Sequence, residues 1–327
     1  MSFGRFLLKR LLQGVVVVWG VITVVFLLRF ITPGSPVDVV APLDASAELR
    51  RQIARELGVN QPLYVQYTEY LLGVVQGDWG YSYISRTEAS ARVFARLPAT
   101  VELAASATVV AVVLSIPLGV VSATRRNQPA DYGATTFSLL GISTPNFWLG
   151  IMLILLLGVQ FEVFPVGGRG VGFLPALGML LVGNPGGIVN WLAHITLPAI
   201  TLGTYFTALI TRLTRSGMLD QLGRSYVRAT RAKGLPETLV RYRHVLRNTL
   251  IPVVTVVGLQ MGTLIGGAVI TEAVFDWPGL GTTVINSINQ RDWPVLQGAL
   301  IVIGVGFVVV NIAVDALYAY LNPRVVE

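Results

Sequence analysis

Few side chains in this sequence are of the types that perform catalysis. The sequence contains no cysteine and only two histidines, His194 and His244, so it lacks the thiolates and imidazole clusters that commonly hold metals. An intramembrane serine hydrolase would need a facing serine and histidine, and only Ser143 with His194 is formally available, without a supporting motif. The phosphate-binding motif G-x-x-x-x-G-K-[ST] is absent. We therefore expect no catalytic residue, no metal site and no ATP bound by this chain itself.

Polar residues inside long apolar stretches are the other functional candidates, because an isolated charge in lipid is costly. For Asp315 we favour an ion pair with an arginine of the inner side, and Asn311 lies four residues earlier on the same helical face. For Glu102 and Glu272 we favour snorkelling to the membrane interface, with a functional role within the membrane as the alternative. The complete set of pathway or intramembrane polar candidates is Glu102, Asn146, Gln260, Glu272, Asn311 and Asp315.

Two further patterns mark single apolar stretches. Small residues recur every fourth position, and such a face lets helices approach closely; we favour helix packing over pathway lining for Gly258, Gly262 and Gly266. A series of threonines can bond to the backbone of its own helix, and it consists of Thr201, Thr204, Thr207 and Thr211.

Membrane helices must position these residues. Of the 327 residues, 53% are hydrophobic and 13% charged, whereas soluble domains carry about 25% charged residues. We predict an all-α integral membrane protein, because six stretches are apolar over the roughly 20 residues that span a bilayer. Pro145 and Pro198 interrupt two of them, and we interpret the Gly- and Pro-rich run 171–189 as a loop or re-entrant piece. The predicted spans are 11–31, 100–123, 137–160, 195–213, 250–274 and 295–321.

Basic residues indicate the orientation of these spans. Nine lysines and arginines lie between Arg212 and Arg247, and short basic loops stay in the cytoplasm. We expect both termini inside and interpret the net charge of +7 as a topology signal, not as a nucleic-acid footprint. The chain then divides into a first unit, 1–31, an extracytoplasmic helical segment, 32–98, and a five-helix core, 99–327, with a cytoplasmic loop, 214–249. The other basic residues of the inner side are Arg5, Lys9, Arg10, Arg125, Arg126 and Arg324.

The extracytoplasmic segment carries its own helix signals. Ser46 can cap a helix that Gly58 ends, and a second helix can start at Pro62. A third helix is expected over 87–97. The segment is longer than a connection requires, so we expect it to lie over the outer mouth.

The cytoplasmic loop carries start and stop signals for a short helix. Ser225 can cap a helix over 226–233, Gly234 can supply its left-handed end, and Pro236 with Glu237 can begin another helix. Small residues would allow close approach of a partner, and basic neighbours would favour an acidic groove. Spacing alone leaves a docking helix and a solvated basic loop equally open. The small and basic residues in question are Ala229, Ala232, Arg228, Arg231 and Lys233.

The same loop, YVRATRAKGLPETLVRYRHVLRNTLIP, resembles the cytoplasmic EAA-type loop of ABC importer permeases. The glycine of that motif falls on Gly234. Its leading triplet falls on Arg228, Ala229 and Thr230 and has largely drifted, and Arg247 replaces its distal proline. These departures resemble the dipeptide/oligopeptide/nickel branch. Further likenesses cover nearly the whole chain: LGVNQPLYVQYTEYLLGVVQGDWGYS, LPATVELA, GISTPNFWLG, FPVGG, TEAVFDWPGLG, RDWPVLQG and NIAVDALYAYLNPR.

This resemblance implies a type I importer permease fold with six transmembrane helices and a role in moving di- or oligopeptides by alternating access. It implies as partners a homologous second permease, two cytoplasmic ATPase subunits that bind ATP and Mg²⁺, an extracellular solute-binding protein and the bilayer of the plasma membrane. A nickel or other small-solute importer is the alternative within the branch. A stand-alone intramembrane enzyme or channel is the alternative of another class. The residues implied to contact the ATPase are Tyr226, Arg228, Ala229, Ala232, Lys233 and Gly234.

Overall fold

The computed structural model of the chain describes residues 3–31 and 34–321. Throughout these ranges the ordered elements are helices, and the β-structure is limited to one isolated bridge between Tyr81 and Glu88. Two positions used above lie outside the described residues, namely Arg324 and the start of the extracytoplasmic segment at Thr32.

Four helices are long and apolar enough to cross a membrane. Two further spans arise only if each of two bent helix pairs counts as one, so the described residues hold four to six candidate spans. The single helices are α1 (Phe3–Ile31), α5 (Ala89–Thr124), α9 (Gly186–Leu222) and α15 (Trp293–Leu321). The first pair is α6 (Pro129–Ser143) with α7 (Asn146–Leu153) and π-helix η1 (Ile154–Gln160); the second is α11 (Glu237–Leu239) and π-helix η2 (Val240–Val245) with α12 (Leu246–Gly267).

The prolines act differently from each other. Pro145 precedes α7, and the pair α6–α7 is bent there by 105°. Pro198 was expected to interrupt its span, but it lies buried inside the continuous helix α9. A proline removes only one backbone N–H, and packed neighbours can hold a membrane helix together around it. The expected separate helix over 87–97 is likewise part of α5, which continues through Pro98 to Thr124.

The segment after α1 contains three short helices, α2 (Pro36–Val40), α3 (Ala47–Glu56) and α4 (Leu63–Gln76). The predicted cap is confirmed, because the Leu49 N–H donates to Ser46 Oγ at 3.2 Å. Gly58 follows α3 with φ +65, as expected of a left-handed end. α4 begins at Leu63, one residue later than predicted, because Pro62 occupies the cap position. α2 and α3 bury a small apolar cluster of their own around Val37, Ala41 and Ile53.

The end of this segment is fastened to the membrane core. Ser82 Oγ donates to Asp292 Oδ2 at 2.5 Å, and the Tyr83 N–H donates to Asp292 Oδ1 at 3.0 Å. Burial raises the pKa of the Tyr83 phenol above its ordinary value. Trp79 packs against a buried cluster that includes Val93 and Trp293. The α2–α3 unit, by contrast, buries a small cluster of its own.

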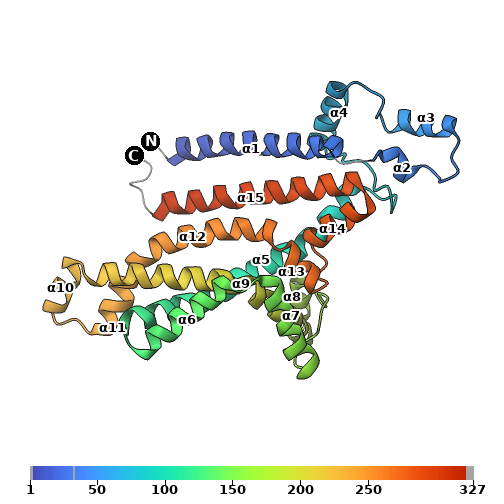
Figure 1. Cartoon of the computed structure of the whole chain (residues 1–327). Helices are drawn as coiled ribbons and strands as arrows, with labels where there is room; N and C mark the ends of the chain where they lie inside the picture. The colour runs from blue at the N-terminus through green and yellow to red at the C-terminus, as the bar shows by residue number, and fades with distance from the viewer. Residues whose placement is uncertain (1–2, 32–33, 322–327) are drawn as a thin grey trace.

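Three long helices, α1, α15 and α12, lie side by side (Figure 1). The main buried cluster joins α5, α9 and α12 and includes Leu103, Leu202 and Trp277. The start of α1 and the end of α15 lie at the same end of the molecule as α10 (Ser225–Ala232) and α11, whereas α2, α3 and α4 lie at the opposite end (Figure 1). The remaining helices are α8 (Phe173–Leu181), α13 (Val269–Val274) and α14 (Leu280–Gln290).

Candidate functional site

The predicted short helix of the loop 214–249 is present as α10, but it starts one residue early. The Val227 N–H donates to the Arg224 carbonyl oxygen at 3.2 Å, so Arg224 is the cap residue and Ser225 is already helical. The expected capping by Ser225 is therefore wrong, since only the residue before the helix can cap it. Gly234 has φ +73, which confirms the predicted left-handed stop.

One face of α10 is held inside the chain, and the other is exposed. Val227 is fully buried in a cluster with Met218 of α9, Val120 of α5 and Val245 of η2. The Tyr226 hydroxyl donates to Gln221 Oε1 at 2.9 Å. The residues on the outward side are exposed and are either small or basic, and they are Arg228, Ala229, Ala232, Lys233 and Gly234. One face of α10 is therefore packed against the rest of the chain, and the opposite face is exposed.

Glu237 fixes the segment that follows α10 through hydrogen bonds to two arginines. Arg231 donates two hydrogen bonds to its carboxylate, at 3.1 and 2.8 Å, and Arg241 donates a third at 2.9 Å. Pro236 is the cap of the following helix and not its first residue. The ion pair between Glu237 and Arg241 could have been predicted from the sequence, because the two residues are four positions apart on one helix. The ion pair between Glu237 and Arg231 depends on the turn at Gly234 and could not.

A large groove lies at the other end of the molecule, between α5, α8 and α9. Its volume is about 750 Å³, and its lining is mostly apolar, with Glu102 and Trp191 among the polar exceptions. Arg169 donates to both carboxylate oxygens of Glu102, at 3.0 and 2.6 Å, and the Phe173 N–H adds a bond of 2.9 Å. Glu102 therefore fastens the loop before α8 to α5 and does not snorkel as expected.

Glu272 is fully buried, which also differs from the snorkelling that we expected. Thr100 Oγ1 donates to its carboxylate at 2.6 Å, and the Thr282 N–H donates at 3.0 Å from the first turn of α14. A carboxylate at a helix N-terminus satisfies free N–H groups and is favoured by the helix dipole. A Cβ on Gly279 would lie 2.2 Å from Glu272 Oε1. Within the motif TEAVFDWPGLG, the glutamate therefore packs directly against the glycines at the start of α14.

The last span carries the predicted ion pair. Arg10 Nε lies 3.1 Å from Asp315 Oδ2, which confirms the expected pairing of Asp315 with an arginine. Asn311 donates to the Phe307 carbonyl oxygen of its own helix at 2.8 Å. The carbonyl and side-chain oxygens of Gln260 both accept from the Thr263 hydroxyl, and Asn146 is a half-buried residue at the start of α7.

Helix packing accounts for the glycine series. A Cβ on Gly258 would lie 2.3 Å from Val314, and one on Gly262 would lie 3.3 Å from Phe307, so both glycines face α15 of the same chain. Gly266 is less tightly packed, with Ile303 at 3.7 Å.

In the threonine series, Thr204 and Thr207 donate to their own helix as predicted, Thr211 donates to the Ser115 carbonyl oxygen, and the Thr201 hydroxyl has no partner among the described residues.

One of the two histidines, His194, lies in a contact within its own helix. His194 Nδ1 lies 2.8 Å from the Asn190 carbonyl oxygen of its own helix. Across residues 3–31 and 34–321, no three His, Cys, Asp or Glu side chains gather as a metal-binding group.

Comparison with known proteins identifies the fold to which these features belong. The profile of the "Binding-protein-dependent transport system inner membrane component" matches residues 115–327, and the profile of the N-terminal part of such components matches residues 3–104. The chain belongs to this permease family.

Three relatives match this permease over nearly its whole length. It is 40% identical to the dipeptide transport system permease protein of Escherichia coli strain K12, over 98% of both chains. It is 38% identical to the oligopeptide transport system permease protein of Bacillus subtilis strain 168, over 98% of this chain and 99% of the relative. It is 37% identical to the glutathione transport system permease protein of E. coli strain K12, over 98% of both.

Family membership decides the class of the protein. This binding-protein-dependent permease is a multi-pass inner-membrane transport subunit and not an enzyme. Permeases of the family work in membrane complexes with ATPases and a substrate-binding protein.

Several polar residues that organise the permease were not found from the sequence. Arg169, Asp292, Asp131 and Arg215 all form contacts to residues far away along the chain. Asp131 had a weak signal, since an acidic residue two positions after a proline is typical of a helix start. Its partner could not be named, because 84 positions separate it from Arg215.

Proposed function

We propose that this permease is one of two homologous membrane subunits of an ATP-driven peptide importer, and that α10 is its contact with a cytoplasmic ATPase subunit. The observation that carries the proposal is the division of α10 into a buried inner face and an exposed face of small and basic residues. ATP and Mg²⁺ are bound by the ATPase subunits, and a solute-binding protein delivers the substrate from outside.

The geometry of α10 suits the transmission of force. Val227 fixes its inner face to the ends of α5, α9 and η2, so a push on the outer face displaces these helices and not a loose loop. Ala229 and Ala232 allow the partner backbone to approach closely, and Arg228 with Lys233 favours an acidic surface around them. The ion pairs of Glu237 hold the exit of the helix in place.

The substrate class rests on the relatives. Their names assign dipeptides, oligopeptides and glutathione to permeases that are similar to this chain at 37 to 40% identity. All of these substrates contain peptide or peptide-like amide bonds, so we infer a short peptide as the substrate here.

We place the substrate pathway along the groove between α5, α8 and α9. Glu102 lies at this groove, and the buried indole N–H of Trp191 has no acceptor among the described residues. The other polar candidates lie outside this lining, so we rank Glu102 first among them.

The experiment compares Ala229→Glu with Ser216→Glu in the complex purified with its partner subunits. Ser216 is exposed on α9, so the same charge is added away from the proposed contact. Ala229→Glu should lose co-purifying ATPase or its stimulation by loaded binding protein, while Ser216→Glu should retain both. Wild-type behaviour of Ala229→Glu would remove α10 from the contact. Uptake of labelled nickel, with no uptake of labelled dipeptide or glutathione, would overturn the substrate class.

A further inference from the structure

A buried carboxylate joins three helices close to α10. Asp131, at the start of α6, is 3% exposed. Arg215 of α9 donates to both of its oxygens, at 2.7 and 2.9 Å. Ser122 Oγ, near the end of α5, donates to Oδ1 at 2.5 Å, and the Asn127 N–H donates to Oδ2 at 2.9 Å. We call these four groups the Asp131 clamp.

The Asp131 clamp lies on the same packed unit as α10. Arg215 precedes the end of α9 at Leu222 by two helical turns, or about 10 Å, and two residues then lead into α10. At this level α5 and α9 are tightly packed, because a Cβ on Gly119 would lie 2.6 Å from Thr214 Cβ. The buried cluster around Val227 adds α10 to the same unit. The ends of α5 and α9 therefore cannot shift independently of α10.

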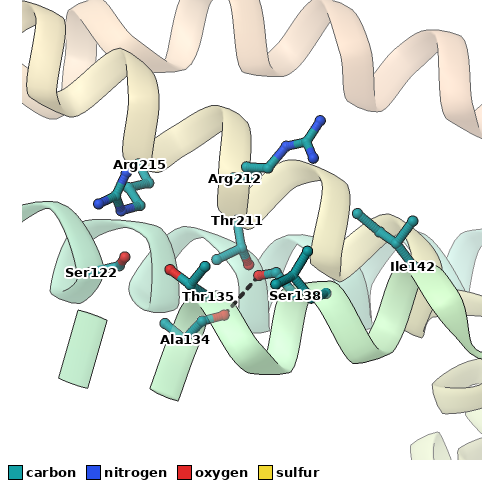
Figure 2. A pocket seen from close by; sticks show the side chains of 9 residues that line it. Ser122, Ala134, Thr135, Ser138, Ile142, Thr211, Arg212 and Arg215 are labelled. Atoms are coloured by element: carbon teal, nitrogen blue, oxygen red, sulfur yellow. Dashed lines mark hydrogen bonds between the residues drawn. The ribbon is translucent and has the colours of Figure 1, made fainter. Parts of the chain in front are cut away.

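α6 is joined to this unit differently. Figure 2 shows a cavity between α6 and α9 beside the Asp131 clamp, with Thr135 and Ser138 of α6 facing Thr211 of α9. Its volume is about 40 Å³, which leaves room for about one water molecule between the facing side chains. The Ser138 hydroxyl is bonded to the Ala134 carbonyl oxygen of its own helix and does not bridge the gap (Figure 2). The ion pair between Asp131 and Arg215 thus holds the start of α6 against α9 beside this cavity.

We propose that Asp131 and Arg215 are positioning residues for energy coupling. The pair makes α6 follow the motion of α10, α9 and α5, so displacement at the ATPase contact reaches the 105° bend between α6 and α7. The inference rests on the proposed contact of α10 with an ATPase. A bidentate arginine–carboxylate pair suits this role because its two parallel bonds fix orientation as well as distance.

The test uses the complex of this permease with its partner subunits in proteoliposomes. The variants are Asp131→Asn, Arg215→Gln and the double variant. The double variant leaves no unpaired buried charge, so it keeps the fold where a single variant fails. Asp220→Asn is the matched control, because it makes the same chemical change at an exposed position of α9. The readouts are co-purifying ATPase, ATP hydrolysis stimulated by loaded binding protein, and labelled dipeptide moved per ATP hydrolysed.

We expect the double variant to retain its ATPase subunits and its stimulated hydrolysis, but to move roughly fivefold less peptide per ATP, in the usual range of couplings between sites. Because the pair acts as a unit, the double variant should be no worse than either single variant. An unchanged ratio of peptide to ATP would overturn the proposal. So would an equal loss of all readouts, which marks a merely structural pair. If α10 does not contact the ATPase, the Ala229→Glu variant will retain both its co-purifying ATPase and the stimulated ATP hydrolysis. That result is distinct from the outcomes for the Asp131 and Arg215 variants.

Discussion

Strain at Gly234 offers a graded test of α10. The residue ends the helix with φ +73, and its N–H donates to the Arg231 carbonyl oxygen at 2.9 Å. A Cβ added there would meet no heavy atom within 4 Å, so a substitution acts through the backbone and not through a clash. A left-handed conformation costs an L-residue about 1–2 kcal/mol, less for asparagine and more for a β-branched residue.

These energies set an order of effects. A cost of about 1–2 kcal/mol changes an equilibrium roughly 5- to 30-fold. The affected quantity is the population of chains in which residue 234 adopts the left-handed conformation that ends α10. We expect this population to stay within a few-fold of wild type in Gly234→Asn, to fall about fivefold in Gly234→Ala, and to fall about 30-fold in Gly234→Val. The loss should appear as co-purifying ATPase and as hydrolysis stimulated by loaded binding protein, with membrane insertion unchanged.

Gly223→Ala is the matched control. Gly223 lies on the other side of α10 with φ −77, and its added Cβ would have its nearest heavy atom at 3.6 Å, an ordinary contact. This variant should behave as wild type. If Gly234→Val coupled normally, or if Gly234→Asn were as damaging as Gly234→Val, backbone strain would not be the reason for the glycine.

Three other predictions concern topology, the outer segment and the buried carboxylate of Glu272. Cysteines introduced at Ser85 and Ser225 of this cysteine-free chain should be labelled from opposite faces of the membrane, and labelling from one face would contradict the proposed orientation. Replacing 36–57 by a short flexible linker should preserve insertion, since that unit buries its own cluster, and should abolish ATPase stimulation by the binding protein; retained stimulation would show that the unit is dispensable. Glu272→Ala should destabilise the detergent-solubilised protein more than Glu272→Gln, by about 1–3 kcal/mol for each donor left unsatisfied, and equal melting temperatures would refute the capping role.

Local structure was predicted correctly from the sequence at several positions where the signal lay within a few residues. The cap at Ser46 and the left-handed ends at Gly58 and Gly234 follow from backbone preferences that neighbours do not override. The apolar stretches predicted the membrane class, because hydropathy over about 20 residues reports the solvent of a helix. The motif order indicated the family. The cap at Ser225 failed by one residue, within the usual uncertainty of a helix boundary.

Tertiary contacts decided the rest. Glu102 and Glu272 look alike in the sequence, yet one is paired with Arg169 and the other caps α14, because different segments fold against them. Pro145 ends a helix and Pro198 does not, since packing decides whether a lost backbone bond is tolerated. Asp131 and Arg215 meet only because α6 and α9 lie side by side. The sequence by itself determined a membrane permease with a capped helix α3 and a glycine-ended helix α10; the fold alone determined which charges pair, because pairing depends on distances that sequence separation does not encode.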